Sequence, residues 1–199
     1  MKRLAAAAAV TFALALGAGG AVLLTRSAPA AAAPAEAGFG RAVFATRVEL
    51  GKHLVITAGC NDCHTPLKMG ERGPEPDMSR MLSGHPEFLQ MPPAPRPQGP
   101  WMVSAAATNT AWAGPWGVSF TANLTPDKET GLGAWTEENF KQTIRTGRHL
   151  GRGREVLPPM PIPMYKNFTD DELKAIFTYL QSIPAVKNRV PVPLPPLSR

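Results

Sequence analysis

Cysteine is scarce in this chain: the 199 residues include only two, Cys60 and Cys63. A disulfide between positions so close together closes a very small loop and would stabilise the fold little. A zinc site would need two further ligands, but no second cysteine pair exists and the other histidines, His53, His85 and His149, lie singly. A redox-active dithiol usually accompanies a βαβ pattern, which this sequence does not show. The scarcity of cysteine therefore argues against a disulfide framework, a zinc site and a dithiol pair.

Charged residues are absent from a long stretch near the start of the chain. Residues 4–24 carry none; a basic tripeptide precedes them, and small residues fill positions 27–33. This order is typical of a secretory signal. The run is also about long enough to span a bilayer, but its many alanines and glycines make it a weak membrane span. We predict a signal peptide or, alternatively, a membrane anchor at 1–33, a linker at 34–38, and a folded part in the periplasm. A retained anchor would attach this part to the cytoplasmic membrane.

The excess of positive charge is small outside this leader. The formal net charge is +6, and removing Lys2, Arg3 and Arg26, which lie in a leader without acidic residues, leaves +3. Proteins that bind nucleic acid usually present a strongly basic surface to the phosphates. We therefore predict that nucleic acid is not a partner.

The chain does contain the run Cys60-Asn61-Asp62-Cys63-His64, a C-x-x-C-H motif. Two thiols on one helical turn can each add across a vinyl group of haem, while the adjacent imidazole ligates the iron. The motif predicts one covalently bound haem c, attached through Cys60 and Cys63, with His64 as the proximal iron ligand. The two haem propionates would bring the charge of the exported part near neutral.

A proline-rich run at residues 157–164 suggests the second iron ligand. Prolines stiffen the backbone and can hold a flexible thioether at bonding distance from iron. Met160, between Pro159 and Pro161, is the better candidate for the distal ligand, and Met164 is the runner-up. The methionines between residues 69 and 102 are expected to fill gaps in the packing.

Hydrophobic periodicity predicts three main helices. The first spans residues 39–58 and leads into the haem motif. Gly51 lies inside it, which suggests either a close crossing by another helix or a break between two shorter helices. The second helix is expected over 136–147, and the third over 169–183, where a capping box opens it.

Between the first and second predicted helices, frequent prolines interrupt the hydrophobic periodicity. Ten prolines lie between residues 65 and 116, and they predict a long loop that wraps the haem face, with one short helix near 78–82. His85 is expected in a surface turn of this loop. We predict one mainly α domain over 39–185, followed by a proline-rich tail over 186–199 that is extended on the surface.

A basic cluster and a tryptophan border the second predicted helix. The cluster is either a solvated face or a group that neutralises haem propionates or an acidic partner. Trp135 either donates its indole N–H to a propionate or packs beside the start of the helix. The cluster, which has no acid within it, comprises Lys141, Arg145, Arg148, Arg152 and Arg154.

The order of these features resembles a class I cytochrome c. The resemblance covers residues 48–184 and is closest to the haem domains in cytochrome subunits of bacterial periplasmic alcohol and aldehyde dehydrogenases, and to their single-haem relatives. It rests on the haem motif, the stretch Pro159-Met160-Pro161, the run Asn123-Leu124-Thr125-Pro126-Asp127, Thr130-Gly131-Leu132-Gly133 and Trp135-Thr136.

The resemblance implies a cytochrome c-like fold, thioether bonds at Cys60 and Cys63, and axial ligation by His64 and Met160. It also implies that the first and last helices cross near Gly51. We therefore expect a carrier of single electrons between redox protein partners, not an enzyme.

Two alternatives remain open from the sequence. One is a peroxidase-like haem enzyme or sensor with an open distal site, in which His85 or His149 would supply the acid or base. The other is an electron-relay subunit fixed within a membrane dehydrogenase complex.

Overall fold

The computed structural model of the chain describes residues 44–92 and 99–196. These belong to one compact unit, Gly38–Arg199. The predicted signal peptide or anchor at 1–33, the linker at 34–38 and the predicted start of the first helix at 39 lie outside the described residues. Within the described ranges, no helix has both the length and the apolar character needed to cross a membrane.

The first helix, α1 (Arg47–Thr57), begins at a capping box: the hydroxyl of Thr46 accepts from the Glu49 amide, and the Glu49 carboxylate accepts from the Thr46 amide. The described residues before Thr46 are not helical, so the helix is shorter than predicted. After a left-handed Gly59, helix α2 (Cys60–His64) carries the haem motif.

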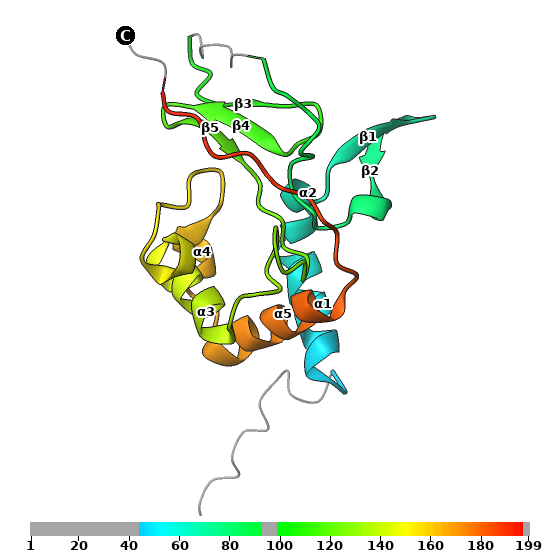
Figure 1. The fold of residues 1–199 in the computed structure, drawn as a ribbon, viewed down its shortest axis with the longest axis vertical. Helices are drawn as coiled ribbons and strands as arrows, with labels where there is room; N and C mark the ends of the chain where they lie inside the picture. The colour runs from blue at the N-terminus through cyan, green and yellow to red at the C-terminus, as the bar shows by residue number, and fades with distance from the viewer. Residues whose placement is uncertain (1–43, 93–98, 197–199) are drawn as a thin grey trace, which may run out of the picture. The chain divides into compact units, whose positions relative to one another are not determined.

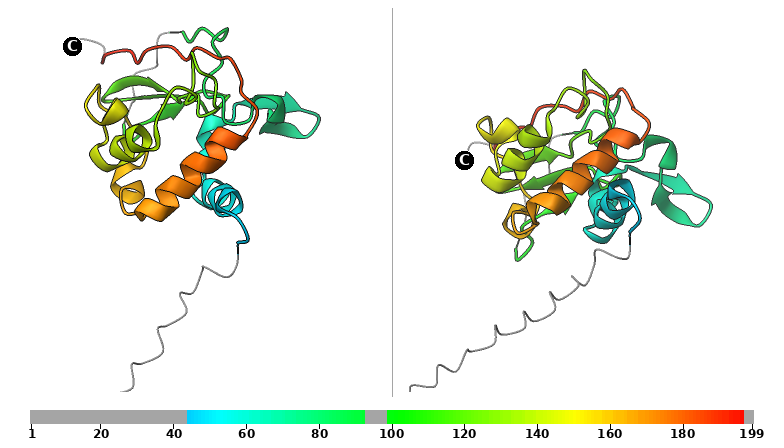
Figure 2. Two further views of the ribbon diagram at one scale, coloured as in Figure 1. Left: turned by 60° about the horizontal axis from the view of Figure 1, so that its bottom comes forward. Right: turned by 90° about the horizontal axis from the view of Figure 1, so that it is seen from below.

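Helix α5 (Asp170–Ser182) closes the fold and opens with the predicted capping box of Thr169 and Glu172. It lies across α1 (Figure 1; Figure 2, left). Gly51 sits at the crossing, where an added Cβ would lie 2.0 Å from the carbonyl oxygen of Ala175 and 2.8 Å from the Cβ of Tyr179. The predicted helix crossing at Gly51 is confirmed.

Helix α3 (Glu137–Thr146) begins at Thr136, as predicted, although Asn139 rather than an acid completes its capping box. Gly147 ends the helix in the left-handed conformation (φ 67°) that glycine adopts without strain. A 3₁₀ turn, η2 (His149–Gly151), and a short helix, α4 (Ile162–Tyr165), follow. Buried side chains of α1, α3 and α5 share one hydrophobic core.

The predicted long loop contains short strands, so the expectation of irregular structure there was wrong. β1 (Leu67–Gly70) and β2 (Gly73–Pro76) form an antiparallel hairpin, and the 3₁₀ turn η1 (Met78–Arg80) follows where a short helix was expected. β3 (Ser104–Ala105), β4 (Ala111–Gly114) and β5 (Gly117–Phe120) form a three-stranded antiparallel sheet.

Proline does not prevent these strands, because it is tolerated on edge strands and at strand ends. In β2 it occupies two of four positions, opposite Leu67 and Met69 of β1. The domain is therefore α-helical with small antiparallel sheets, rather than mainly α with one long loop.

The segment 186–196 is extended, as predicted, but it is hydrogen-bonded to the rest of the fold. Val118 of β5 and Leu194 exchange two backbone hydrogen bonds of 3.0 and 2.9 Å. In Figure 1 this segment runs from the end of α5 to the edge of β5. Asn188, within it, is completely buried. We call residues 186–196 the C-terminal strap.

Replacing Gly51 with alanine should loosen the crossing of α1 and α5. The new methyl group would meet the Ala175 carbonyl, and overpacking of this kind costs about 1–3 kcal/mol, more than the gain in helix propensity of at most about 1 kcal/mol. Chemical denaturation of the haem-loaded protein measures the loss. The control is Lys52→Ala at the next, exposed position; equal stability of the two variants would contradict the prediction.

Candidate functional site

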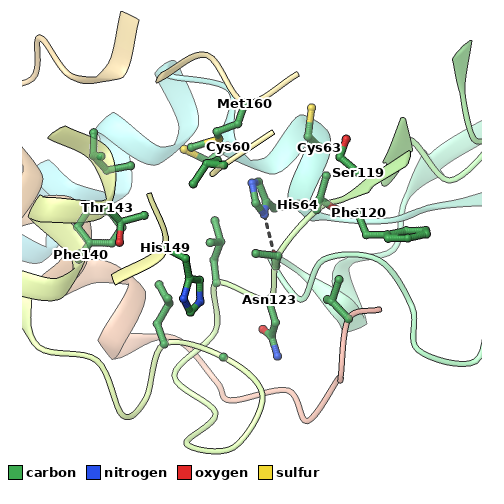
Figure 3. A pocket seen from close by; sticks show the side chains of 18 of the residues that line it. Cys60, Cys63, His64, Ser119, Phe120, Asn123, Phe140, Thr143, His149 and Met160 are labelled. Atoms are coloured by element: carbon green, nitrogen blue, oxygen red, sulfur yellow. Dashed lines mark hydrogen bonds between the residues drawn. The ribbon is translucent and has the colours of Figure 1, made fainter. Parts of the chain in front are cut away.

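One cavity of about 380 Å³ brings together the residues of the two sequence motifs. Cys60, Cys63 and His64 line it from α2, and Met160 lines it from the loop before α4 (Figure 3). Its volume falls within the range of small-molecule and cofactor pockets. Apolar side chains form much of the remaining wall, among them Leu124, Leu132, Phe140, Ile144, Leu173, Ile176 and Leu180.

The ring of His64 is fixed by one hydrogen bond. Its Nδ1 lies 2.7 Å from the carbonyl oxygen of Ala122, marked by the dashed line in Figure 3. A carbonyl can only accept, so Nδ1 carries the proton and Nε2 keeps its lone pair. Burial lowers the pKa of His64, and the Ala122 carbonyl opposes this shift in part. The ring is thus held neutral, in the tautomer that can ligate a metal through Nε2.

The two thiols are free and lie three positions apart on α2. Burial raises the pKa of Cys60 to about 11 and raises that of Cys63 in the same direction, with the charge of Asp62 adding to both shifts. Both side chains are therefore protonated at neutral pH. Their position on the pocket wall suits attachment of a ligand that fills the cavity.

The two candidate methionines lie in different environments. Met160 lines the cavity and packs against the hydrophobic core, whereas Met164 is 62% exposed and is not among the lining residues. Pro159 and Pro161 also line the cavity. Two hydrogen bonds hold this loop. The hydroxyl of Ser119 donates to the carbonyl of Pro158 at 2.5 Å, and the amide of Ile162 donates to the carbonyl of Met160 at 2.9 Å. This arrangement favours Met160 over Met164.

Trp135 and His149 form one side of the pocket. Their rings meet edge to face with centroids 5.0 Å apart, and both residues line the cavity. Burial lowers the pKa of His149, and the positive charge of Arg154 lowers it further. The partly buried Trp135 is thus packed beside the start of α3 and also reaches the pocket, so the two predicted roles are compatible.

The basic cluster divides into two parts. Arg145 donates to a carboxylate oxygen of Asp170 at 2.6 Å, and Lys141 lies 3.9, 3.2 and 3.7 Å from carboxylates of Glu137, Glu138 and Asp170. The other members, Arg148, Arg152 and Arg154, are exposed in and around η2 and form no ion pair with an acid among the described residues. Only this second part is available for a partner.

The prediction that His85 lies in a surface turn is wrong. The side chain is completely buried: Nδ1 lies 3.0 Å from the hydroxyl of Thr110, and Nε2 lies 3.0 Å from the carbonyl of Leu89. Burial lowers its pKa. His85 is not among the residues that line the cavity, whereas His149 is.

Three contributors to the site were not predicted. Ala122 acts through its carbonyl, which no side-chain pattern reveals. Tyr165 lines the cavity and donates its hydroxyl to the carbonyl of Ala58, just before α2. Residues 189–193 of the C-terminal strap line the cavity as well. Of these three contributors, only Tyr165 could have been found from the sequence, as an aromatic residue directly after the proline-rich run at 157–164.

The donor set fits a haem. Two thiols stand beside an imidazole with a free Nε2, and a thioether enters the same largely apolar cavity. A haem attached through thioethers and held by histidine and methionine needs these groups and this surrounding. In the described ranges, no three His, Cys, Asp or Glu side chains gather as they would for a metal ion held by protein ligands alone.

Comparison with known proteins points to the same kind of site. The family model described as Cytochrome c matches residues 48–184. The chain is 26% identical over 152 residues to the fructose dehydrogenase cytochrome subunit of Gluconobacter japonicus, covering 73% of this chain and 24% of that protein. It is 34% identical over 88 residues to a subunit of nicotinate dehydrogenase from Pseudomonas putida, covering 44% of this chain and 7% of that protein.

A third relative is the cytochrome c subunit of a quinone-dependent alcohol dehydrogenase from Gluconobacter oxydans, 33% identical over 80 residues, 39% of this chain and 16% of that protein. The chain thus spans less than a quarter of the length of each of these relatives. The resemblance to cytochrome subunits of bacterial dehydrogenases, expected from the motifs, is confirmed.

Replacing Tyr165 with phenylalanine should cost about 0.5–1.5 kcal/mol of stability, because the Ala58 carbonyl loses its donor. Burial raises the pKa of Tyr165 from 10.0 to about 12, so the folded state favours the protonated phenol. The contribution of the hydroxyl is then complete below pH 10 and declines as the pH rises toward 12. Denaturation of both proteins from about pH 8 to 12 measures this difference; a constant difference would contradict the prediction.

Proposed function

The chain belongs to the cytochrome c family, and we propose that it is a periplasmic carrier of single electrons with one haem c, whose iron is ligated by His64 and Met160. The observation that carries the proposal is the cavity that His64, Met160, Cys60 and Cys63 line together. A haem bound there supplies an iron that takes up and releases one electron.

Each residue then has a defined task. Cys60 and Cys63 attach the cofactor covalently through their sulfurs. His64 would offer Nε2 to the iron, because its Nδ1 proton is hydrogen-bonded to the carbonyl of Ala122. Met160 offers a thioether from a loop held by proline and by the hydrogen bond from Ser119. Fixed ligands on both sides keep reorganisation small when the charge changes, which suits a carrier.

The pocket wall supports a relatively high reduction potential. Methionine as an axial ligand raises the potential, and an apolar surrounding disfavours the more highly charged ferric state. Leu132, Phe140 and Ile144 are buried and line the cavity, so they contribute to this effect.

We propose no catalytic role for this chain. In the alternative, a haem enzyme or sensor, Met160 would stay unbound and a distal histidine would act on the ligand. His85 does not line the cavity, so His149 is the remaining candidate for that role. The ring of His149 packs against Trp135 at the side of the pocket.

The partners are redox proteins, and the exposed arginines near the pocket are the part of the surface that would meet them. Arg154 lines the cavity, and Arg148 and Arg152 lie beside it in and around η2. A local positive charge next to a redox centre steers partners of negative charge. The relatives are subunits of dehydrogenases; a fixed place in such a complex is the alternative to free diffusion between partners.

Met160→Ala should remove the weak long-wavelength absorption band that a methionine sulfur gives on ferric haem iron. The potential should fall on the order of 100 mV, a fraction of the roughly 0.8 V that axial ligands span. The visible spectrum and a redox titration of the purified protein measure both effects. Met164→Ala is the matched control and should change neither.

Two results would overturn the assignment. If Met164→Ala rather than Met160→Ala loses the band, the distal ligand is Met164. If the wild-type ferric protein lacks the band and is high-spin, the distal position is open and the enzyme or sensor function becomes the better proposal.

Arg152→Gln/Arg154→Gln should slow oxidation of the ferrous protein by ferricyanide, an anionic probe, by roughly tenfold at low ionic strength. The difference should shrink as salt screens the charges. Stopped-flow kinetics measures the rate. The matched control is Arg47→Gln/Lys52→Gln, which removes two exposed charges from α1; an equal effect of both double variants would contradict a localised docking surface.

A further inference from the structure

Asn188 of the C-terminal strap is completely buried, and its side-chain amide uses all its hydrogen-bonding capacity. Its Nδ2 donates to the carbonyls of Ser83 and His85, at 2.7 and 2.9 Å. Its Oδ1 accepts from the guanidinium of Arg80 at 2.8 Å and from the amide of Glu87 at 2.9 Å. One side chain, distant in sequence, thus holds residues 80–87 at four points.

The four residues 82–85 form a spacer beside His64. On one side, the amide of Gly84 donates to the carbonyl of His64 at 2.8 Å, and the amide of Leu82 donates to the hydroxyl of Thr65 at 3.0 Å. This segment therefore contacts the backbone of the proximal histidine directly.

The other side of the same segment binds the stretch of chain that follows β5. The amide of His85 donates to the carbonyl of Thr121 at 3.0 Å, and the amide of Leu124 donates to the carbonyl of Leu82 at 2.8 Å. Ala122, which accepts the Nδ1 proton of His64, lies between these two contacts. The 82–85 segment thus sets the spacing between His64 and its acceptor.

Gly84 is packed tightly against the stretch of chain that follows β5. Its φ of 77° is in the left-handed region, and an added Cβ would lie 2.3 Å from the carbonyl oxygen of Thr121 and 2.6 Å from the carbonyl carbon of Ala122. The backbone of 82–85 is therefore pressed against the residues that present the acceptor to His64. Loosening of the segment would therefore remove a support of that acceptor.

We propose that Asn188 is a positioning residue for the proximal histidine: by clamping Ser83 and His85, it holds the Ala122 carbonyl against Nδ1 of His64. The inference rests on the proposed haem-binding function. The hydrogen bond from Nδ1 makes the imidazole a stronger electron donor to iron, so the strap controls the potential of the site from outside the ligand set. The strap also lines the cavity with residues 189–193.

The test uses Asn188→Ala and Asn188→Asp in the full, haem-loaded chain. Aspartate keeps an oxygen acceptor for Arg80 and the Glu87 amide but offers no donor to the two carbonyls. In the ferrous protein, with carbon monoxide bound if the distal position is open, NMR follows exchange of the His64 Nδ1 proton with solvent. We expect exchange to be faster on the order of tenfold in both variants, since both lose the two hydrogen bonds to the carbonyls of Ser83 and His85. Asn188→Ala also loses the two bonds that Oδ1 accepts.

The reduction potential gives a second readout. A weaker hydrogen bond at Nδ1 makes His64 a poorer donor, so the potential should rise in Asn188→Ala, which adds no charge, while the methionine band is retained. The control is Val55→Ala, which removes buried core volume outside the cavity lining. Faster exchange in both Asn188 variants and a higher potential in Asn188→Ala, with neither change in the control, support the proposal. Equal exchange rates in all three variants, or an unchanged potential in Asn188→Ala, overturn it.

The wild-type protein provides a measurement that needs no variant to fold. The His64 Nδ1 proton should exchange in the same opening event as the amides of Gly84 and His85, ahead of the Val55 amide in α1. Exchange of the Nδ1 proton only with Val55, after the other two amides have exchanged, overturns the proposal. A wild-type protein without covalent haem contradicts the proposed function instead, so the two failures are distinguishable.

Discussion

The hydrogen bond from Nδ1 of His64 to the carbonyl of Ala122 is the interaction on which the site depends. The short helix α2 places His64 directly after the two cysteines, but it cannot orient the ring by itself. The orientation comes from a backbone carbonyl 58 positions further along the chain. The hydrogen bond that fixes neutral His64 in the tautomer with a free Nε2 forms only when these two parts of the fold lie together.

The β-structure between α2 and α3 explains how the two parts meet. The β4–β5 hairpin delivers residues 121–124 to the pocket, and β1–β2 with η1 brings residues 82–85 beside them. The C-terminal strap then joins both, through Asn188 and through the bridge between Leu194 and Val118. The strands therefore form a frame around the proximal side rather than a loose cover over the haem face.

The distal side is built differently. Met160 comes from a loop between α3 and α4, and its support consists of neighbouring prolines, contacts with the core and the hydrogen bond from Ser119. Helices α1 and α5, which cross at Gly51, contribute to the core against which it packs. The two proposed ligands thus share support from β5, which carries Ser119 and leads into the Ala122 carbonyl that orients His64.

Residue type and spacing alone were enough to predict the haem motif at Cys60 and the helix starts at Thr136 and Thr169. These features depend on neighbours in sequence, so a pattern reveals them. At Gly51, residue type and spacing left a helix crossing and a helix break open, and the resemblance to class I cytochromes c implied the crossing. The burial of His85, the orientation of His64 by Ala122 and the clamp made by Asn188 emerged from the folded chain. Those roles depend on backbone carbonyls and on partners distant in sequence, up to 105 positions away for Asn188, which residue type and spacing do not encode.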